Sequence, residues 1–167
     1  MQNLLQISRK VDYALRAMIH LATLPEGVRE PQQEVAARND IPRDFLAKIL
    51  KKLVDQGLVS AHRGPRGGVA LARPASEISF LDVIEAVDGP VVLNLCLDAT
   101  QGCSQDSTCT MQAVWRAGQE RMLDVYRATS LATLVPGPQS TAPVPLHYGQ
   151  TTLAVGPAKP PSPGSID

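Results

Sequence analysis

Three helix-prone segments followed by a glycine-rich hairpin constrain the fold of this chain more than any other feature. The first segment, residues 8–24, places apolar side chains on one face at a period of about 3.6 residues, and Ser8 can cap its start. A short second helix is expected over residues 32–38. The third helix is expected to run from Pro42 to about Gln56. This order of elements predicts a small helical unit.

The segment after these helices is typical of a β-hairpin. Two β-prone runs, residues 58–63 and 69–73, flank the turn Gly64-Pro-Arg-Gly-Gly68. A hairpin that follows three helices is the wing of a winged helix-turn-helix. In that fold the third helix fits the major groove of B-DNA and its first residues meet base edges. Residues 1–75 are therefore expected to form a DNA-binding region.

Charge is segregated along the chain although its totals balance at 16 Lys and Arg against 16 Asp and Glu. Residues 1–75 contain 12 basic and 7 acidic side chains, whereas residues 76–135 contain 3 and 8. A basic first half and an acidic second half indicate a polyanion-binding module joined to a regulatory or dimerising one. Chance segregation over a solvated surface is the alternative.

Seven charged side chains of the first region are candidates for contact with DNA: Arg43, Asp44, Lys48, Lys51, Lys52, Arg63 and Arg66. The first three lie near the start of the third helix, where base edges are read. The two lysines that follow are placed to touch phosphates, and the two arginines of the wing could enter the minor groove. An ordinary solvated helix and a plain turn are the alternatives, but the combination in this order favours DNA.

The second half combines a fourth helix, a cysteine-bearing loop and a fifth helix. Ser79-Phe-Leu-Asp82 has the pattern of a capping box, and the fourth helix is expected to end near Gly89. The fifth helix is expected to start near Thr110. Apolar and small residues recur along it at heptad spacing, at Met111, Trp115, Gly118, Met122 and Val125. Such a seam could pack against a partner helix, or the helix could bury it in its own core.

The expected fold is mainly α with a small β wing. It comprises a winged helix-turn-helix at 1–75, a Pro-rich tail at 136–167, and between them, at 76–135, a cysteine-bearing loop and a long dimerisation helix. The loop is expected to bind a metal cluster, for the reasons given next. Eight of the 14 prolines lie in that tail, which shows no periodic apolar pattern. We expect the tail to be disordered.

The three cysteines, Cys96, Cys103 and Cys109, lie in a polar loop with gaps longer than those of a C-x2-C zinc knuckle. A long loop can wrap thiolates around an iron–sulfur cluster, and these soft ligands suit such a cluster or zinc. A tetrahedral or cluster site needs four ligands, and the three cysteines supply three of them. The fourth ligand is therefore His, Asp, Glu, water or a residue from a second subunit. A metal-free redox switch, in which Cys103 and Cys109 form a disulfide, is the competing hypothesis.

Other function classes find little support in the sequence. No apolar run is long enough to span a membrane and the start lacks a signal-peptide pattern, so a cytoplasmic protein without a membrane partner is expected. The histidines His20, His62 and His147 are scattered, and neither an H-E-x-x-H motif nor a nucleophile elbow is present. An enzyme is therefore not expected.

From residue 7 to about 135 the sequence resembles the Rrf-two family of bacterial transcription regulators, which includes IscR-like and NsrR-like members. The resemblance is carried, in order, by Asp12-Tyr-Ala-Leu-Arg16, Phe45-Leu-Ala-Lys-Ile-Leu-Lys-Lys-Leu53, Gly57-Leu-Val-Ser60, Arg63-Gly-Pro-Arg-Gly-Gly68 and Cys109-Thr-Met-Gln-Ala-Val-Trp-Arg116. It implies a homodimer, joined through the fifth helix, that reads a partly palindromic DNA operator. It also implies that Lys48 and Arg63 contact bases and that the three cysteines hold an iron–sulfur cluster, 2Fe-2S or 4Fe-4S.

Two departures from the family pattern bear on that cluster. Six residues separate the first two cysteines where five are common, and Gln112 stands where IscR-like members carry a His. NsrR-like members can instead take a carboxylate from the first helix of the partner subunit. Asp12 occupies the matching position and is the candidate fourth ligand, with a surface charge in the first helical turn as its alternative role. The resemblance thus implies a regulator, more often a repressor, that senses nitric oxide, redox state or iron status.

Overall fold

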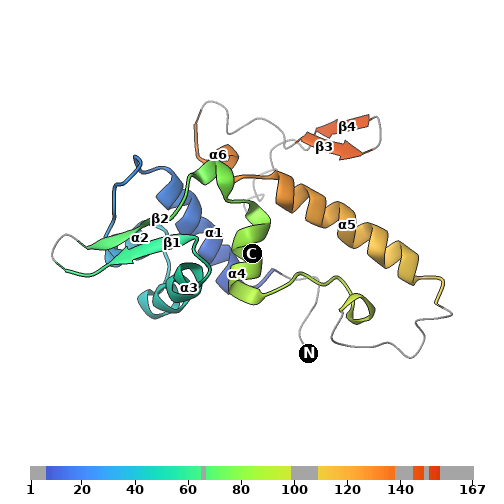
Figure 1. Cartoon of the computed structure of the whole chain (residues 1–167), viewed down its shortest axis with the longest axis horizontal. Helices are drawn as coiled ribbons and strands as arrows, with labels where there is room; N and C mark the ends of the chain where they lie inside the picture. Colours follow the sequence, from blue (N-terminus) through green and yellow to red (C-terminus); the bar gives the residue numbers. More distant parts are fainter. Residues whose placement is uncertain (1–6, 65–66, 99–108, 138–144, 149–150, 155–167) are drawn as a thin grey trace, which may run out of the picture. The chain divides into compact units, whose positions relative to one another are not determined.

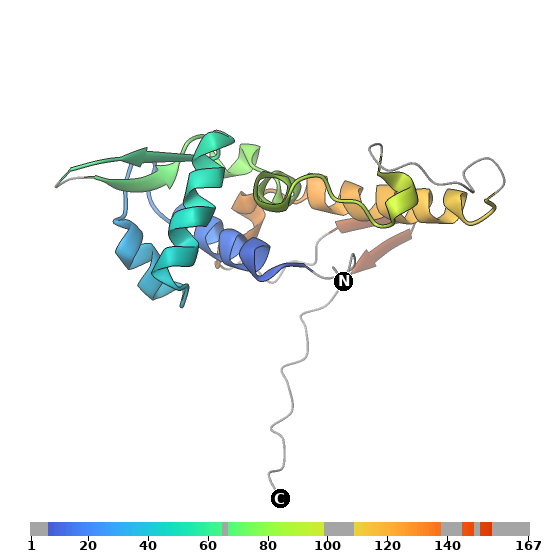
Figure 2. The ribbon, with the colours of Figure 1, turned by 90° about the horizontal axis from the view of Figure 1, so that it is seen from below.

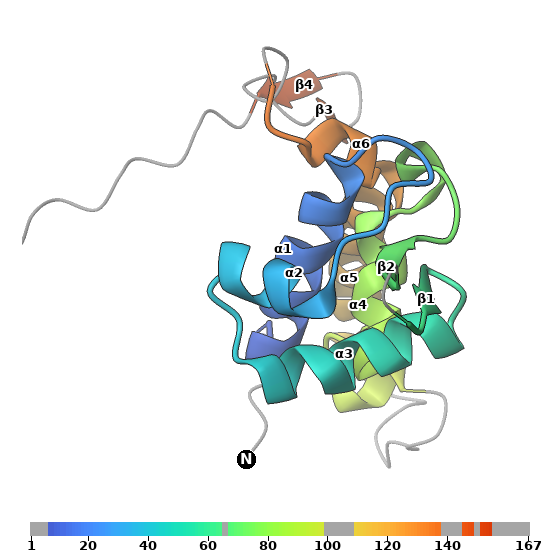
Figure 3. The ribbon, with the colours of Figure 1, turned by 90° about the vertical axis from the view of Figure 1, so that its left-hand side faces the viewer.

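Three helices open the part of the chain that the computed structural model describes, which is residues 7–64, 67–98, 109–137, 145–148 and 151–154. They are α1 (Arg9–Ala22), α2 (Gln32–Arg38) and α3 (Arg43–Asp55), close to the bounds predicted from the sequence. α2 and α3 pack against each other and against α1 (Figures 1 and 3). This arrangement is a helix-turn-helix supported by a preceding helix.

Local chemistry explains where these helices begin. The Ser8 hydroxyl oxygen accepts a hydrogen bond from the Val11 N–H at 3.3 Å, so Ser8 caps α1 as predicted. Asp40 adopts a left-handed φ of 52° in the turn before α3, a conformation that Asp tolerates better than most residues. Pro42, predicted as the first residue of the third helix, instead lies just before it with φ of −57°. A shift of this size is within the usual uncertainty of helix ends.

The predicted wing is present as an antiparallel pair of strands, β1 (Val59–His62) and β2 (Gly68–Leu71). Val59 pairs with Leu71 at the base of the wing and His62 pairs with Gly68 toward its tip. An isolated bridge joins Glu30, which precedes α2, to Val69 of β2. The wing is therefore fastened to the segment that connects α1 with α2.

A mostly aliphatic core joins the helices and the wing. Its largest fully buried side chains include Met18 of α1, Leu46 and Leu53 of α3, and the later residues Ile78 and Leu131. Aromatic residues lie at the edge of this core. Phe45 of α3 stays 48% exposed, with its ring edge-on to that of Tyr13 at a centroid distance of 6.3 Å. An aliphatic core is what a sequence with 4% aromatic residues allows.

After the wing, the short 3₁₀ helix η1 (Ala75–Glu77) leads to α4 (Phe80–Asp88). The capping box predicted at the start of α4 is present. The Asp82 N–H donates to the Ser79 hydroxyl at 3.0 Å, and the Ser79 N–H donates to the Asp82 carboxylate at 2.9 Å. α4 packs against α1 and α3, so it connects the helix-turn-helix to the second half of the chain.

The second half continues through a 3₁₀ helix, η2 (Leu95–Leu97), to the long helix α5 (Gln112–Ala128) and the short helix α6 (Leu131–Leu134). Figure 2 shows α5 extending away from the helix-turn-helix, with η2 beside its N-terminal half. The C-terminal half of α5 lies against the core, where the rings of Tyr126 and Phe80 are 5.2 Å apart. The C-terminal half of α5 thus packs against the core through Tyr126, and the other half extends beyond it.

The chain divides into two compact units, Met1–Val135 and Pro136–Asp167. The second unit contains an antiparallel hairpin of β3 (Pro145–Tyr148) and β4 (Thr151–Ala154). Most of the rest of the tail that was expected to be disordered lies outside the described residues. No helix of the described residues is long and apolar enough to cross a membrane.

Candidate DNA-binding surface and cysteine site

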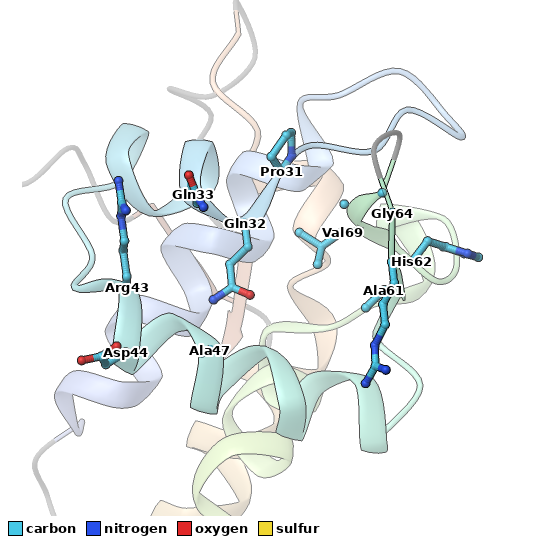
Figure 4. Close-up of a pocket in the computed structure, with 13 residues that line it drawn as sticks. Pro31, Gln32, Gln33, Arg43, Asp44, Ala47, Ala61, His62, Gly64 and Val69 are labelled. Carbon is cyan, nitrogen blue, oxygen red and sulfur yellow. The ribbon is translucent and has the colours of Figure 1, made fainter.

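A groove of about 740 Å³ lies between the helix-turn-helix and the wing (Figure 4). Arg43, Asp44 and Ala47 line it from the first turns of α3, and Arg63 lines it from the end of β1. Three glycines, Gly64, Gly67 and Gly68, line the groove on the side of the wing, beside His62 and Val69. Because α3 begins at Arg43, the groove exposes the end of the helix that reads bases in a winged helix-turn-helix.

The start of α2 also lines this groove, which sequence reasoning missed. Gln32 and Gln33 belong to the lining, and Figure 4 shows the Gln32 side chain extending from α2 toward Ala47 of α3. A glutamine amide can donate and accept hydrogen bonds with phosphates or base edges. The signal was available in the sequence, because the first helix of a helix-turn-helix crosses the DNA backbone.

The seven predicted DNA-contact residues do not all fall in one place. Arg43, Asp44 and Arg63 line the groove, while Lys48 and Lys51 are exposed farther along α3. Arg66 lies outside the described residues.

Lys52 differs from the other lysines of α3. Its ammonium donates a hydrogen bond to the main-chain carbonyl oxygen of Val87, in the last turn of α4. A lysine engaged in this way is less available to a phosphate. The predicted phosphate contact of Lys52 therefore competes with a contact inside the protein.

The second site surrounds two of the three predicted cysteines. Cys96 lies in η2, which packs against α5, and Cys109 lies just before the start of α5. Both are free thiols and both are half-buried. Cys103 lies outside the described residues. Among the residues that the structure describes, no three His, Cys, Asp or Glu side chains form a group able to hold a metal ion.

The segment that carries Cys96 is fastened to α5. The Leu93 N–H donates a hydrogen bond to the Gln119 side-chain oxygen at 2.8 Å, and a Cβ at Gly118 would lie 3.6 Å from the Leu93 side chain. Both thiols are therefore attached to the N-terminal half of α5, one through η2 and one directly.

Asp12, the candidate fourth ligand, lies in the first turn of α1. Its carboxylate forms an ion pair with Arg16 of the same helix at 2.9 Å, and its side chain is 48% exposed. An exposed pair of this kind contributes little to stability and can exchange partners at low cost. The carboxylate is thus accessible from solvent.

α5 does not present its predicted heptad seam uniformly. Gly118 faces the chain's own Leu93, and Met122 and Val125 are half-buried. The exposed apolar residues gather at the start of the helix instead, at Met111 (61% exposed), Val114 (70%) and Trp115 (38%). The described part of α5 has no buried residue. The apolar residues of the seam are therefore exposed at the start of α5 and half-buried toward its C-terminal end.

These features agree with the comparison to known families. Residues 7–137 match the model of the Rrf2 family, described as an iron-dependent transcriptional regulator. The chain belongs to the Rrf2 family. This confirms the resemblance to the Rrf-two family that the sequence motifs indicated.

Several named relatives of this Rrf2 chain are transcriptional regulators. A Mycobacterium tuberculosis protein provisionally named an HTH-type transcriptional regulator is 38% identical over 133 residues, covering 80% of this chain and 83% of its own length. The HTH-type transcriptional regulator IscR of Escherichia coli is 32% identical over 131 residues, covering 78% and 80%. The Rrf2 chain is accordingly a transcriptional regulator rather than an enzyme.

Solved structures share the fold of this Rrf2 regulator. Oxidized Staphylococcus aureus CymR aligns with a TM-score of 0.63 at 27% identity, covering 80% of this chain and 98% of CymR. T. potens IscR aligns with a TM-score of 0.61 at 24% identity, covering 77% and 84%. The predicted fold class, mainly α with a small β wing, is confirmed.

Proposed function

We propose that this chain acts as a homodimer in the cytoplasm that binds a partly palindromic operator and represses transcription. The observation that carries this function is the groove between α3 and the wing, which brings Arg43 and Arg63 to one surface from two separate elements. Two basic side chains on facing elements suit a duplex, because α3 can enter the major groove while the wing follows an adjacent minor groove. Lys48 and Lys51 extend the same basic surface along α3.

Residues of this surface divide by role. Lys48 and Arg63 read base edges, because Arg and Lys are the side chains that pair with guanine in the major groove and enter narrow minor grooves. Asp44 can accept a hydrogen bond from a cytosine amino group. Arg43 lies beside Asp44 at the end of α3 that meets base edges, and Lys51 neutralises a phosphate farther along the helix. Arg66 is assigned to the minor groove at the wing tip from its place in the sequence.

The dimer forms through the N-terminal half of α5. Met111, Val114 and Trp115 are exposed there, and three large apolar side chains within one helical turn favour burial against a second copy. Recognition helices of a dimer must be about 34 Å apart to reach successive turns of B-DNA. The contact between two α5 helices would fix that spacing.

The thiolates of Cys96, Cys103 and Cys109 hold an iron–sulfur cluster, and Asp12 of the partner subunit is the fourth ligand. The donor set fits the cofactor, because thiolates are the usual ligands of such clusters and two of the three thiols are free and attached to the same half of α5. The description of the family as iron-dependent supports this assignment. When bound, a 2Fe-2S or 4Fe-4S cluster supplies a centre that nitric oxide, oxidants or iron shortage alter.

A metal-free thiol switch is the second candidate. The neighbour CymR has been solved in an oxidized form, and Cys109 of this chain is a half-buried free thiol. Oxidation of a pair such as Cys103 and Cys109 to a disulfide would also change the segment before α5. This mechanism uses the same segment and needs no iron.

Anaerobic purification followed by absorbance spectroscopy and iron and sulfide counting separates the two candidates. The cluster predicts a coloured protein that contains iron and acid-labile sulfide and bleaches with nitric oxide. Cys103→Ala should abolish the colour. A colourless anaerobic protein without iron, whose operator affinity changes reversibly with thiol oxidation, would establish the thiol switch and reject the cluster.

A further inference from the structure

We propose that Lys52 is a positioning residue that fastens the recognition helix α3 to the last turn of α4, directly ahead of the segment that carries Cys96. Its ammonium donates a hydrogen bond to the Val87 carbonyl oxygen. The inference rests on the DNA-binding function proposed above and assigns Lys52 a role other than phosphate contact. Through this bond, the position of the cysteine segment influences the position of α3.

The end of α4 provides a chemical reason for this contact. A helix leaves the carbonyl oxygens of its last turn without partners inside the helix. One of them, on Glu85, accepts a hydrogen bond from the Gly89 N–H at 3.0 Å, whereas the carbonyl of Val87 is reached by Lys52. A cation at a helix C-terminus also interacts favourably with the helix dipole. Lys52 thus supplies the end of α4 with both a hydrogen-bond donor for a carbonyl oxygen and a positive charge near the helix dipole.

The next residue of α4 makes a second connection. The Ser8 hydroxyl donates a hydrogen bond to the Asp88 carboxylate, and the same Ser8 oxygen accepts from the Val11 N–H as the cap of α1. Two successive residues of α4 therefore hold α3 on one side and the start of α1 on the other. The first turn of α1 also carries Asp12, the proposed fourth ligand.

The chain beyond α4 leads directly to the cysteine site. Gly89 ends the helix with a φ of 86°, a conformation that favours glycine. The segment is next held where the Leu93 N–H binds Gln119 of α5, and it then reaches Cys96 in η2. The connection between Asp88 and Cys96 is short and attached at both ends. A displacement of Cys96 relative to α5 is consequently passed to the last turn of α4 and, through Lys52, to α3.

A double-mutant cycle between Cys96 and Lys52 tests the connection in the full-length protein. The readout is the dissociation constant for an operator duplex that the wild-type protein selects from random sequences. In the wild-type background, Cys96→Ala should change that constant by about 5–150-fold, the range of usual allosteric couplings. In the Lys52→Met background, the same change should have an effect of no more than about twofold. Lys52→Arg keeps a donor for the Val87 carbonyl and should restore the Cys96 effect.

Lys51→Met is the matched control, because both neighbouring lysines of α3 are exposed and Lys52 is the one that reaches the Val87 carbonyl oxygen. It should preserve the Cys96 effect while reducing the slope of log affinity against log salt by about 0.9, as expected for one lost phosphate contact. Lys52→Met should leave that slope unchanged. A salt slope reduced by Lys52→Met, together with an intact Cys96 effect, would overturn the positioning role.

Hydrogen exchange of the backbone amides of Gly89 and of residues 91–97 tests the connection without DNA. Lys52→Met should speed exchange there, whereas Lys51→Met should not. Unchanged exchange in Lys52→Met would reject the connection even if the wild-type protein proves to be a DNA-binding regulator. Failure of the wild-type protein to select any duplex would instead reject the proposed function, and the exchange measurement would still decide the connection.

Discussion

Glu30 and Val69 exchange two backbone hydrogen bonds: the Glu30 N–H donates to the Val69 carbonyl at 3.0 Å, and the Val69 N–H donates to the Glu30 carbonyl at 2.9 Å. The Glu30 carboxylate also contacts His20 of α1 and Arg38 of α2. With its side chain only 13% exposed, Glu30 ties both helices to the wing. The orientation of the wing toward α3 is therefore set by a residue outside the DNA surface.

Gly68→Ala should displace the wing and weaken operator binding. A Cβ at this position would lie 2.7 Å from the Glu30 carbonyl oxygen, and the φ of 155° also disfavours a side chain. Because the obstacle is backbone rather than a flexible side chain, relief requires β2 to move away from Glu30. We expect weaker operator affinity, measured by fluorescence anisotropy. The helices should remain folded, so the midpoint of thermal unfolding should fall only slightly.

Ala72→Ser is a control for Gly68→Ala, because Ala72 is exposed and lies just after β2. It should leave both measurements unchanged. Wild-type operator affinity in a folded Gly68→Ala protein would show that the bridge between Glu30 and the wing does not set the DNA-binding geometry.

Arg63→Ala and Lys51→Ala should affect DNA binding in different ways. Arg63 lines the groove at the wing, so its loss should reduce the preference for the operator over an unrelated duplex by about 1–3 kcal/mol. Lys51→Ala should weaken binding to both duplexes alike and lower the salt slope by about 0.9. The measurement is a salt titration of both duplexes with each variant. Equal losses on the two duplexes for Arg63→Ala would argue against its role in sequence reading.

Trp115→Asp should dissociate the dimer. Trp115 is 38% exposed near the start of α5, and a carboxylate buried against a second copy would lose its hydration without gaining a partner. Sedimentation velocity should show a monomer. Val28→Asp is the control, because Val28 is also an exposed apolar residue, at 44%, and lies in the loop before α2. If both variants sediment like the wild-type protein, α5 is not the dimer contact.

Asp12→Ala should destabilise the cluster, whereas Arg16→Ala should not. Both changes break the same exposed ion pair, which is worth about 0.2–0.5 kcal/mol, so their effects on folding should be alike and small. Only Asp12→Ala removes the proposed ligand. The measurement is the iron content and visible absorbance of anaerobically purified protein. Equal iron in the two variants would remove Asp12 from the ligand set.

The helix-turn-helix and the wing could be predicted from sequence because each element carries its own local signals. Ser8 and Ser79 mark helix starts through side-chain hydrogen bonds to nearby backbone, and the Gly-rich run before Val69 marks the wing. Such signals act over a few residues and do not depend on distant partners. The family match is consistent with them.

Contacts between distant parts of the chain were not predictable in the same way. Lys51 and Lys52 look alike in the sequence, yet the hydrogen bond of Lys52 to Val87 depends on how α4 packs against α3. The contact between the C-terminal half of α5 and the core likewise depends on Tyr126 meeting Phe80 of α4. The packing of η2, which carries Cys96, against α5 is a tertiary feature of the same kind.

The central claim is that the cysteine site controls how tightly the groove between α3 and the wing binds DNA. The most direct test is an anaerobic fluorescence-anisotropy titration of the operator duplex with the wild-type protein and with a variant in which Cys96, Cys103 and Cys109 are all replaced by Ala. We predict dissociation constants that differ by about 5–150-fold. Equal dissociation constants for two folded, dimeric proteins would contradict the claim.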